Sequence, residues 1–366
     1  MELLYKPDWA EAKERICPFW KGESIGRPFL CITAPTGERK RLDPPPTYRE
    51  KVLDIDFRLR DYEEELKTTY YGGEAVPCFW PDLGPDFTSA CIGGESVIAN
   101  RPADAEIPGT IWAMPVIDDW DRDLPKIELD TENVWYKRGM EFTKIAVKQG
   151  VGKYLVEILD VDGGMDTAAG LRGTERLCMD LIECPEKIGI LLEIIREGNR
   201  NIIEKLYSIV KNSQGGMINT HKLFAPGITY NMRSDFSYMI DPAMFRELVL
   251  PYMLRESETV DYIMFHTHTE DAETNIKNRL NYLDVILDIP RVQTVEWSCL
   301  GLSIDVKLTG IRRILESGKT AFLFSKPNEV LEITKRLGKH DACRVLHIVR
   351  ASSVAEAEDI LIKLEK

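Results

Sequence analysis

Basic residues are outnumbered by acidic ones in this sequence of 366 residues, 47 against 60, and long hydrophobic runs are scarce. The formal net charge is −13. Non-specific binding to nucleic acid or to an anionic membrane surface requires a basic surface, so we expect neither as a partner. No apolar stretch is long enough to cross a bilayer, and the N-terminus lacks the charged-then-apolar order of a signal segment. We therefore expect a cytoplasmic protein.

Paired cysteines and common nucleotide or hydrolase motifs are also missing. The eight cysteines include no Cys-x-x-Cys pair, which in a chain of this length indicates reduced, mostly buried thiols. The glycine-rich stretch 162–173 fits neither a dinucleotide fingerprint nor a P-loop, and no Gly-x-Ser-x-Gly motif occurs. The hydrophobic content of 44% and charged content of 29% are ordinary globular values, which excludes wholesale disorder.

Short apolar runs alternate with amphipathic helical stretches along the chain. Helices are predicted at 186–210, 242–260 and 328–337. The predicted strands are 29–34, 75–80, 154–159, 216–223, 262–268, 294–299, 320–324 and 344–349. Eight strands with intervening helices predict an α/β fold, a (β/α)₈ TIM barrel. We expect one domain over residues 1–366, with residues 1–26 as an N-terminal helical extension.

The segment 80–120 departs from this alternation. It is rich in proline, glycine and tryptophan and has no clear helical period. Long loops in a compact domain are usually lids or binding surfaces, so we expect a functional loop insertion here.

Histidine is rare, with five residues, yet two of them stand together at the end of a predicted strand. His266 and His268 close the run 262–268. Alternate strand residues face the same side, so both imidazoles are expected to emerge together, as in a metal site. Two polar strand-end residues hydrogen-bonded to their neighbours would give the same pattern, because His-x-His is weakly specific.

Three segments carry a family resemblance. They are the stretch 171–186, the stretch 234–252 with its Ser-Asp-Phe-Ser-Tyr-Met-Ile-Asp-Pro start, and Phe19-Trp20 with Gly26-Arg27-Pro28. Together they resemble the uroporphyrinogen decarboxylase superfamily over nearly the whole chain. The resemblance implies a barrel that hosts one of two chemistries. True decarboxylases use no metal, whereas the methylcobamide methyltransferases use zinc to activate a thiol that takes a methyl group from a corrinoid protein.

The arginine motif of the true decarboxylases is missing. Their loop normally reads Met-Arg-Gln-Ala-Gly-Arg-Tyr, and this chain has the basic loop 33–41 in its place. Arg39 and Arg41, with Arg27, could still bind carboxylates of a substrate. Asp82 or Asp86 could serve as the early aspartate of a decarboxylase. A solvated charged loop explains the two loop arginines equally well.

The methyltransferase branch matches at the histidines. It carries His-x-Cys where this chain has His266-Thr267-His268, and a further cysteine near the place of His347 on the last strand. The resemblance therefore implies a zinc ion held by His266 and His268, with imidazole in place of sulfur, and with His347 or a strand-end carboxylate completing the site. Such a site favours a harder acceptor than a thiolate. A buried core histidine is the other interpretation of His347.

Strand-end carboxylates supply the remaining candidates. Asp160, Asp162 and Glu296 are candidate catalytic residues, because a buried unpaired carboxylate is costly unless it has a function. Trp80 and Asp235 join Asp82 as candidate substrate-binding residues. Trp112 and Trp297 are further candidate walls for a flat substrate, although core packing explains the tryptophans as well.

These observations favour a methyltransferase of one-carbon or corrinoid metabolism, with zinc as cofactor. Its expected partner is a corrinoid protein or a small-molecule substrate, and a homodimer is a possible assembly. A decarboxylase of a polycarboxylate such as uroporphyrinogen, and a non-catalytic barrel that serves as an accessory protein, are the alternatives, because one barrel fold hosts many chemistries.

Overall fold

A seven-stranded sheet forms the largest part of the fold. The computed structural model describes residues 2–98, 101–102, 111–267 and 276–365. The strand order is β2-β1-β13-β12-β11-β10-β9, and every neighbouring pair is parallel except β1 with β2. These strands are β1 Phe29–Pro35, β2 Thr69–Gly73, β9 Thr229–Met232, β10 Tyr262–His266, β11 Thr294–Glu296, β12 Thr320–Ser325 and β13 Val345–Arg350.

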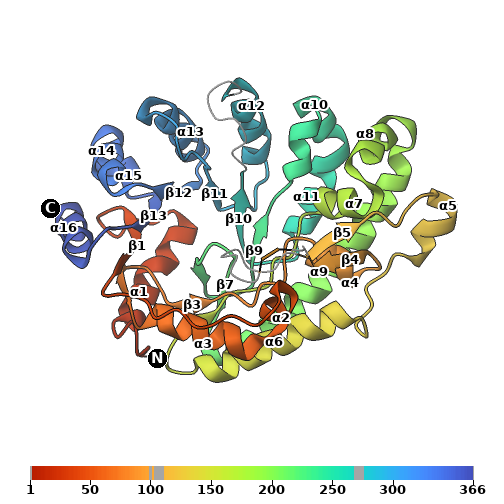
Figure 1. Ribbon diagram of the computed structural model, residues 1–366. Coiled ribbons are helices and arrows are strands. Elements are labelled where there is room, and N and C mark those ends of the chain that lie inside the picture. The colour runs from red at the N-terminus through yellow and green to blue at the C-terminus, as the bar shows by residue number, and fades with distance from the viewer. Residues whose placement is uncertain (1, 99–100, 103–110, 268–275, 366) are drawn as a thin grey trace.

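Three smaller sheets complete the strand inventory of the described residues. A parallel pair joins β3 Cys78–Phe79 to β6 Leu155–Val156, and antiparallel pairs join β4 Glu95–Ile98 to β5 Ile111–Met114 and β7 Met217–Ile218 to β8 Phe224–Ala225. An isolated parallel bridge between Glu157 and Ile218 connects β6 to β7. Figure 1 shows these sheets arranged around a common centre, with the helices outside them.

All eight predicted strands are present, at least in part, so the mixed α/β class is confirmed. The closed barrel is not confirmed, because the described hydrogen bonds form separate sheets rather than one ring. Five described strands were not predicted. They are the hairpin strands β4 and β5, the two-residue β8, and two strands of the large sheet. Of these last two, β2 is antiparallel to β1, and β9, the short run Thr-Tyr-Asn-Met, pairs directly with β10.

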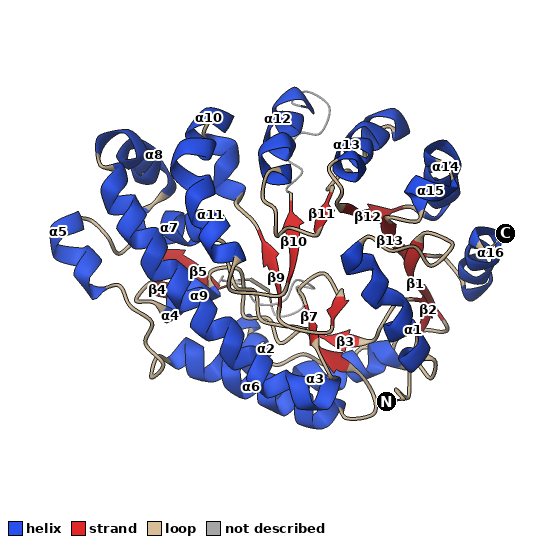
Figure 2. Cartoon of the chain, turned by 180° about the vertical axis from the view of Figure 1, so that it is seen from behind, coloured by secondary structure: helices blue, strands red, loops and turns tan. Residues whose placement is uncertain are grey.

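Helices cover the outer side of the sheets (Figure 2). Short 3₁₀ turns occupy Cys17–Lys21, Leu124–Lys126 and Asp235–Met239, and a π turn occupies Phe245–Val249. The α-helices are α1 Trp9–Ile16, α2 Tyr48–Leu53, α3 Ile55–Leu66, α4 Phe87–Cys91, α5 Trp120–Asp123, α6 Val134–Gly150, α7 Gly164–Arg172, α8 Thr174–Glu183, α9 Pro185–Gln214, α10 Pro242–Met244, α11 Leu250–Ser257, α12 Ile276–Leu287, α13 Ile304–Glu316, α14 Pro327–Leu337, α15 Lys339–Ala342 and α16 Val354–Leu364.

The three predicted helices are found, with one interruption. Helix 186–210 corresponds to α9 and 328–337 to α14, whereas 242–260 is divided into α10, the π turn and α11. Pro251 has no N–H to donate, so the α-helical ladder cannot run regularly through this point. Asp241 accepts hydrogen bonds from the backbone N–H groups of Ala243 and Met244 and so caps the N-terminus of α10.

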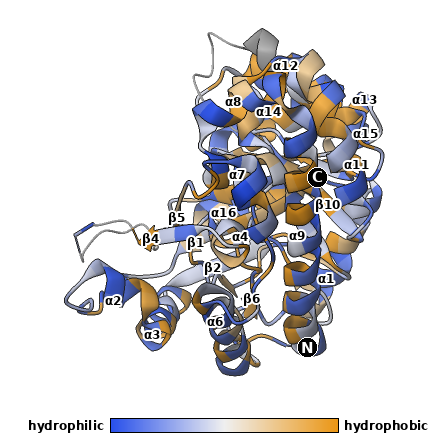
Figure 3. Ribbon diagram, turned by 90° about the vertical axis from the view of Figure 1, so that its right-hand side faces the viewer, coloured by the Kyte–Doolittle hydropathy of each residue, from blue (hydrophilic) through white to orange (hydrophobic). Residues whose placement is uncertain are grey.

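The segment 80–120 contains more structure than a loop. Helix α4 and the β4–β5 hairpin lie within it, while residues 99–100 and 103–110 fall outside the described residues. The hairpin projects from the side of the molecule (Figure 3), and Trp112 and Met114 on it are exposed. Among the described helices, none has the length and apolar character required to span a membrane.

The central strands bury both faces. On β1, Phe29 and Cys31 belong to the apolar cluster on the inner side of the sheets. Leu30 and Ile32 point to the outer side and pack with α16. Strands buried on both faces are typical of parallel sheets covered by helices. Polar side chains are therefore expected at strand ends rather than within the strands.

Candidate metal centre

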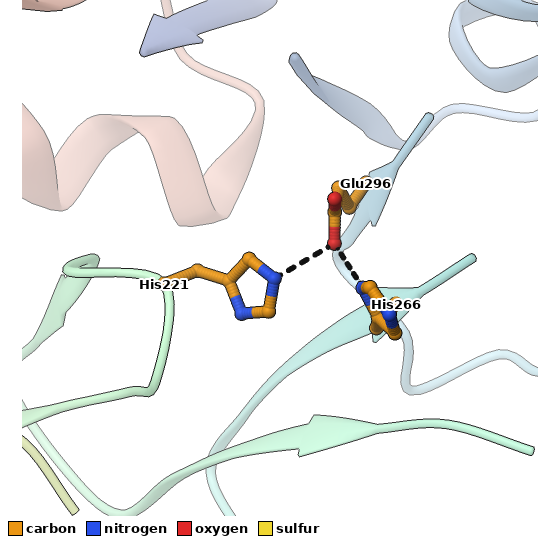
Figure 4. A group of neighbouring side chains, drawn as sticks. All are labelled: His221, His266 and Glu296. Carbon is orange, nitrogen blue, oxygen red and sulfur yellow. Dashed lines mark hydrogen bonds and ion pairs between the residues drawn. The ribbon is translucent and has the colours of Figure 1, made fainter. Parts of the chain in front are cut away.

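Two neighbouring strand ends and one turn bring three potential metal ligands together. His266 is the last residue of β10, Glu296 is the last residue of β11, and the two are directly paired in the sheet. His221 comes from the turn between β7 and β8. One ligand atom from each residue lies within 4.8 Å of the other two (Figure 4).

Glu296 lies at the centre of this group. Its Oε2 accepts from Nε2 of His221 at 3.0 Å and also from Nδ1 of His266, and the residue is 2% exposed. Burial alone would raise the pKa of Glu296, but the charges and hydrogen bonds of the two histidines outweigh it and lower the pKa to about 2. For His266, burial lowers the pKa, yet the hydrogen bond and charge of Glu296 produce a net increase. Glu296 is therefore a carboxylate at neutral pH.

The backbone around this group is held by side chains. The Oδ1 of Asn219 accepts from the backbone N–H groups of His221 and Leu223 at 3.0 Å each, which fixes the turn. The hydroxyl of Thr267 donates to the carbonyl of Glu296 at 2.7 Å, which ties the end of β10 to the end of β11. The three ligands are thus positioned before any ion binds.

Side chains other than Glu296 also lie against the ring of His221. The side-chain amide of Asn231, on β9, contacts its Nδ1, and the ring centroids of Phe322 and Phe324 each lie 5.9 Å from its own. The Oδ1 of Asn231 is buried without a hydrogen-bond partner among the described residues. One ring nitrogen of His221 therefore faces Asn231, and the other faces Glu296.

A second polar group, built around Arg233, lies close to the first. The Arg233 guanidinium is 2.8 Å from Oδ1 of Asp160 and donates from Nε to Oδ1 of Asp162 at 2.7 Å. Burial, together with the charge of Asp160, raises the pKa of Asp82 to about 7. The charge of Arg233 also acts on His266, so the two groups are electrostatically linked.

The predicted metal ligands have three different outcomes. His266 is in the group, and His268 lies outside the described residues. The expectation that His347 completes the site is corrected. Its Nδ1 lies 2.8 Å from the hydroxyl of Ser325, and it alternates on β13 with Leu346, which packs inside the ring of strands. Burial lowers the pKa of His347 to about 4, as for a neutral core histidine.

The predicted carboxylates divide between the two groups. Glu296 lies among the potential ligands, whereas Asp160 and Asp162 pair with Arg233. Asp82 is buried and accepts from the backbone of Gly84 at 2.7 Å. The backbone N–H of Asp235 donates to Asp166 at 3.0 Å.

The structure does not bring the predicted substrate-binding arginines to this site. Arg27 precedes β1 and is buried in an ion pair with Glu74, so it lies at the opposite end of the strands from His266. Arg39 is exposed and pairs with Asp61 and Glu65 on α3, and Arg41 is exposed in the same loop. These placements correct the expectation of an anionic pocket built from the three arginines.

The tryptophans are also dispersed. Trp80 is half-buried, and its carbonyl accepts from Arg58 at 3.1 Å. Trp297 is a core residue with 1% exposure, and Trp112 is 48% exposed on the hairpin. They do not form a common wall.

Sequence reasoning missed His221, Asn231 and Arg233. His221 belongs to the predicted strand 216–223 and follows the observed strand by three residues. With only five histidines in the chain, a second strand-end histidine was the available signal. Asn231 and Arg233 were missed with β9 itself.

Comparison with known proteins gives a likeness of fold. No family model and no curated sequence matches this chain. A methyltransferase from Methanosarcina mazei superposes with a TM-score of 0.62 at 12% identity, covering 97% of this chain and 98% of that one. Methylaspartate ammonia lyase from Clostridium tetanomorphum gives a TM-score of 0.36 at 13% identity over 87% of this chain and 62% of that one, which is too low to support an argument.

Proposed function

We propose that this protein is a metal-dependent methyltransferase on an incompletely closed (β/α)₈ barrel. His221, His266 and Glu296 are the proposed protein ligands of a divalent ion, and zinc is the ion we propose. The convergence of these three side chains, with Glu296 buried and the two histidines partly buried, is the observation that carries the proposal. The fold likeness to a methyltransferase and the sequence resemblance to the methylcobamide branch support the reaction class.

The three residues suit zinc chemically. Two imidazoles and one carboxylate form a ligand set found in catalytic zinc sites, which keep a further coordination position open for a substrate. Glu296 carries its charge at neutral pH, as a ligand must. Nitrogen and oxygen ligands make the ion a harder Lewis acid than sulfur ligands would.

Held by His221, His266 and Glu296, a divalent ion would lower the pKa of a thiol or alcohol acceptor, which would then attack as an anion. The acceptor loses its proton to solvent, its lone pair forms the new bond to the methyl carbon, and the donor leaves with the electrons of the broken bond. The donor is a methylated corrinoid protein or a small methyl compound. The chain contributes by holding both reactants in line.

The decarboxylase alternative has less support. It requires free cations for the carboxylates of a substrate, and Arg27 and Arg39 are already paired with carboxylates of the chain. An accessory protein without catalysis would share the fold, so activity measurements must distinguish it.

The first test is metal content. Protein purified without chelator should contain close to one divalent ion per chain, and His266→Ala and Glu296→Gln should each reduce that content strongly. His340→Ala is the matched control, because His340 on α15 is 89% exposed and remote from the group. An equal metal content in all four proteins would contradict the proposed ligands.

The second test is methyl transfer. Methylcobalamin is incubated with the protein and a thiol or alcohol, and the loss of the methyl group is followed by cobalt absorption. Wild-type protein and His340→Ala should catalyse the change, and His266→Ala should not. Absence of the change with every acceptor, together with carbon dioxide release from a porphyrinogen, would favour the decarboxylase.

A further inference from the structure

Helix α11 carries a buried glutamate that the proposed metal centre does not use. Glu256 is 7% exposed. Its Oε1 accepts from the hydroxyl of Tyr230 on β9 at 3.3 Å and from the side-chain amide of Asn199 on α9 at 3.5 Å. Burial raises the pKa of Glu256 to about 7, against the hydrogen bonds of these two residues. Glu256 therefore changes its protonation state near neutral pH while the protein is folded.

Charged groups of both signs lie around Glu256. The charge of Arg196 on α9 lowers its pKa, and that of Asp166 on α7 raises it. Arg233, which follows β9, and Tyr252 on α11 line a cavity of about 20 Å³ together with Glu256 and Arg196. A polar cavity of this size is large enough for one water molecule. The carboxylate form of Glu256 can therefore be hydrated without unfolding of the chain.

The hydroxyl of Tyr230 lies at the same distance from two acceptors. It is 3.3 Å from Oε1 of Glu256 and 3.3 Å from the backbone carbonyl of Asp162. A phenol has one proton to donate. The hydroxyl donates to Glu256 when this residue is ionised, because a charged acceptor forms the stronger hydrogen bond. When Glu256 is protonated, the acid donates to the oxygen of Tyr230, whose own proton is then free for Asp162. The protonated form thus connects α11 through β9 to the residue that also pairs with Arg233.

Strand β9 connects Glu256 to the metal centre. Tyr230 and Asn231 are consecutive on it and face opposite sides. Tyr230 contacts Glu256 on one side, and Asn231 contacts Nδ1 of His221 on the other. We propose that Glu256 is a positioning residue of the metal centre: its protonated form holds β9 so that Asn231 orients His221, and its ionisation weakens metal binding. The role of His221 as a ligand in this coupling rests on the proposed function.

The experiment measures zinc affinity at pH 6 and pH 8.5 by competition with a chromophoric chelator. Glu256→Gln keeps a neutral side chain whose amide donates to Tyr230 at either pH. Tyr230→Phe removes the hydroxyl and keeps the ring. Glu332→Gln, at an exposed position on α14, is the matched control. Circular dichroism checks that each protein is folded at both pH values.

Proteins are compared with one another at the same pH, because protons compete with zinc for the ligands in every one of them. Wild type and Glu256→Gln should bind zinc equally at pH 6. At pH 8.5 wild type should bind zinc about 5-fold or more weakly than Glu256→Gln, since couplings between sites are typically about 5- to 150-fold. Glu332→Gln should follow wild type at both pH values.

Tyr230→Phe lacks the hydroxyl that carries the coupling. It should bind zinc more weakly than wild type at pH 6 and should match wild type at pH 8.5. Equal zinc affinities of wild type and Glu256→Gln at pH 8.5 would overturn the role of Glu256. If Glu256→Gln does not fold, Tyr230→Phe decides the question, and the same ratio of its affinity to that of wild type at both pH values would overturn it.

The two proposals fail in different ways. Zinc affinity that depends on Glu256 as expected, without any methyl transfer, would support the positioning role and contradict the methyltransferase. Methyl transfer by a protein whose zinc affinity is unaffected by Glu256→Gln would support the methyltransferase and contradict the positioning role. Absence of zinc binding in wild type at both pH values would contradict both.

Discussion

Asn231 and His221 are in side-chain contact, with the amide of Asn231 against Nδ1 of the imidazole, while Nε2 of the same ring lies 3.0 Å from Glu296. An amide can present either its oxygen or its nitrogen to a ring nitrogen. In the structure the amide nitrogen of Asn231 faces Nδ1, which leaves the proton on Nε2 against Glu296. A flipped amide, whose Oδ1 accepts from Nδ1–H, places the lone pair on Nε2, as a bound ion requires. Such outer partners commonly orient metal-binding histidines.

Asn231→Leu should therefore weaken metal binding by about 10- to 100-fold, the usual range for loss of such a partner. Asn231→Asp retains an acceptor for Nδ1–H and should bind metal more tightly than the leucine variant. Affinity is measured by competition with a chromophoric chelator. Unchanged affinity in Asn231→Leu would show that Asn231 does not orient His221.

The lowered pKa of Glu296 predicts that metal-free protein loses stability in acid. Folding lowers its pKa from 4.5 to about 2, so its contribution is present above pH 4.5 and is lost as the pH falls toward 2. The full shift corresponds to about 3 kcal/mol at most. The difference in unfolding free energy between wild type and Glu296→Gln should shrink between pH 5 and pH 3 in urea titrations. Glu332→Gln, at an exposed position, is the control.

The contribution of His266 to stability should depend on pH in the opposite direction, so that it is lost as the pH rises. Its pKa is raised in the folded protein, so its contribution is complete below its unfolded pKa, near 6.5, and disappears as the pH rises through the folded value. Metal-stripped His266→Ala should therefore differ most from wild type in mildly acidic solution and less in alkaline solution. A difference that grows with rising pH would contradict this interaction with Glu296.

The sequence predicted the strands better than it predicted the site. Apolar runs identified all eight expected strands, because strands buried on both faces are continuously apolar. The same signal failed for β9, whose Thr-Tyr-Asn-Met is short and polar, and with it Asn231 and Arg233 were missed. His221 was missed because it follows the two-residue strand β7 and belongs to a turn.

His347 shows a different limit. The apolar run 344–349 placed His347 correctly on the last strand. The face of the sheet toward which it points depends on the strand register, because a shift of one residue moves every side chain to the opposite face. His266 and Glu296 lie two and three residues before the ends of their predicted strands, and each is the last residue of the observed strand. The sequence therefore located both residues near the edge where parallel strands meet, but not the exact strand ends.

The buried ion pair of Arg27 with Glu74 should affect stability rather than substrate binding. Arg27→Met would leave the fully buried carboxylate of Glu74 with Arg15 and one backbone N–H, so we expect a loss of about 3 kcal/mol in unfolding free energy. Arg39→Met should lose at most about 1 kcal/mol, because its partners are exposed. Chemical denaturation measures both variants. Equal losses of unfolding free energy in the two variants would contradict this difference between a buried and an exposed pair.

Lys222 should lose backbone strain when it is replaced by glycine, because its φ is +62°. A left-handed conformation costs a non-glycine residue about 1–2 kcal/mol. The greater freedom of glycine in the unfolded chain offsets about half of that, so we expect Lys222→Gly to gain roughly 0.5–1 kcal/mol in unfolding free energy. The measurement is urea denaturation, with Lys222→Ala as a control that keeps the strain and should not gain stability. A glycine variant less stable than wild type would mean that the side chain of Lys222 stabilises the native state.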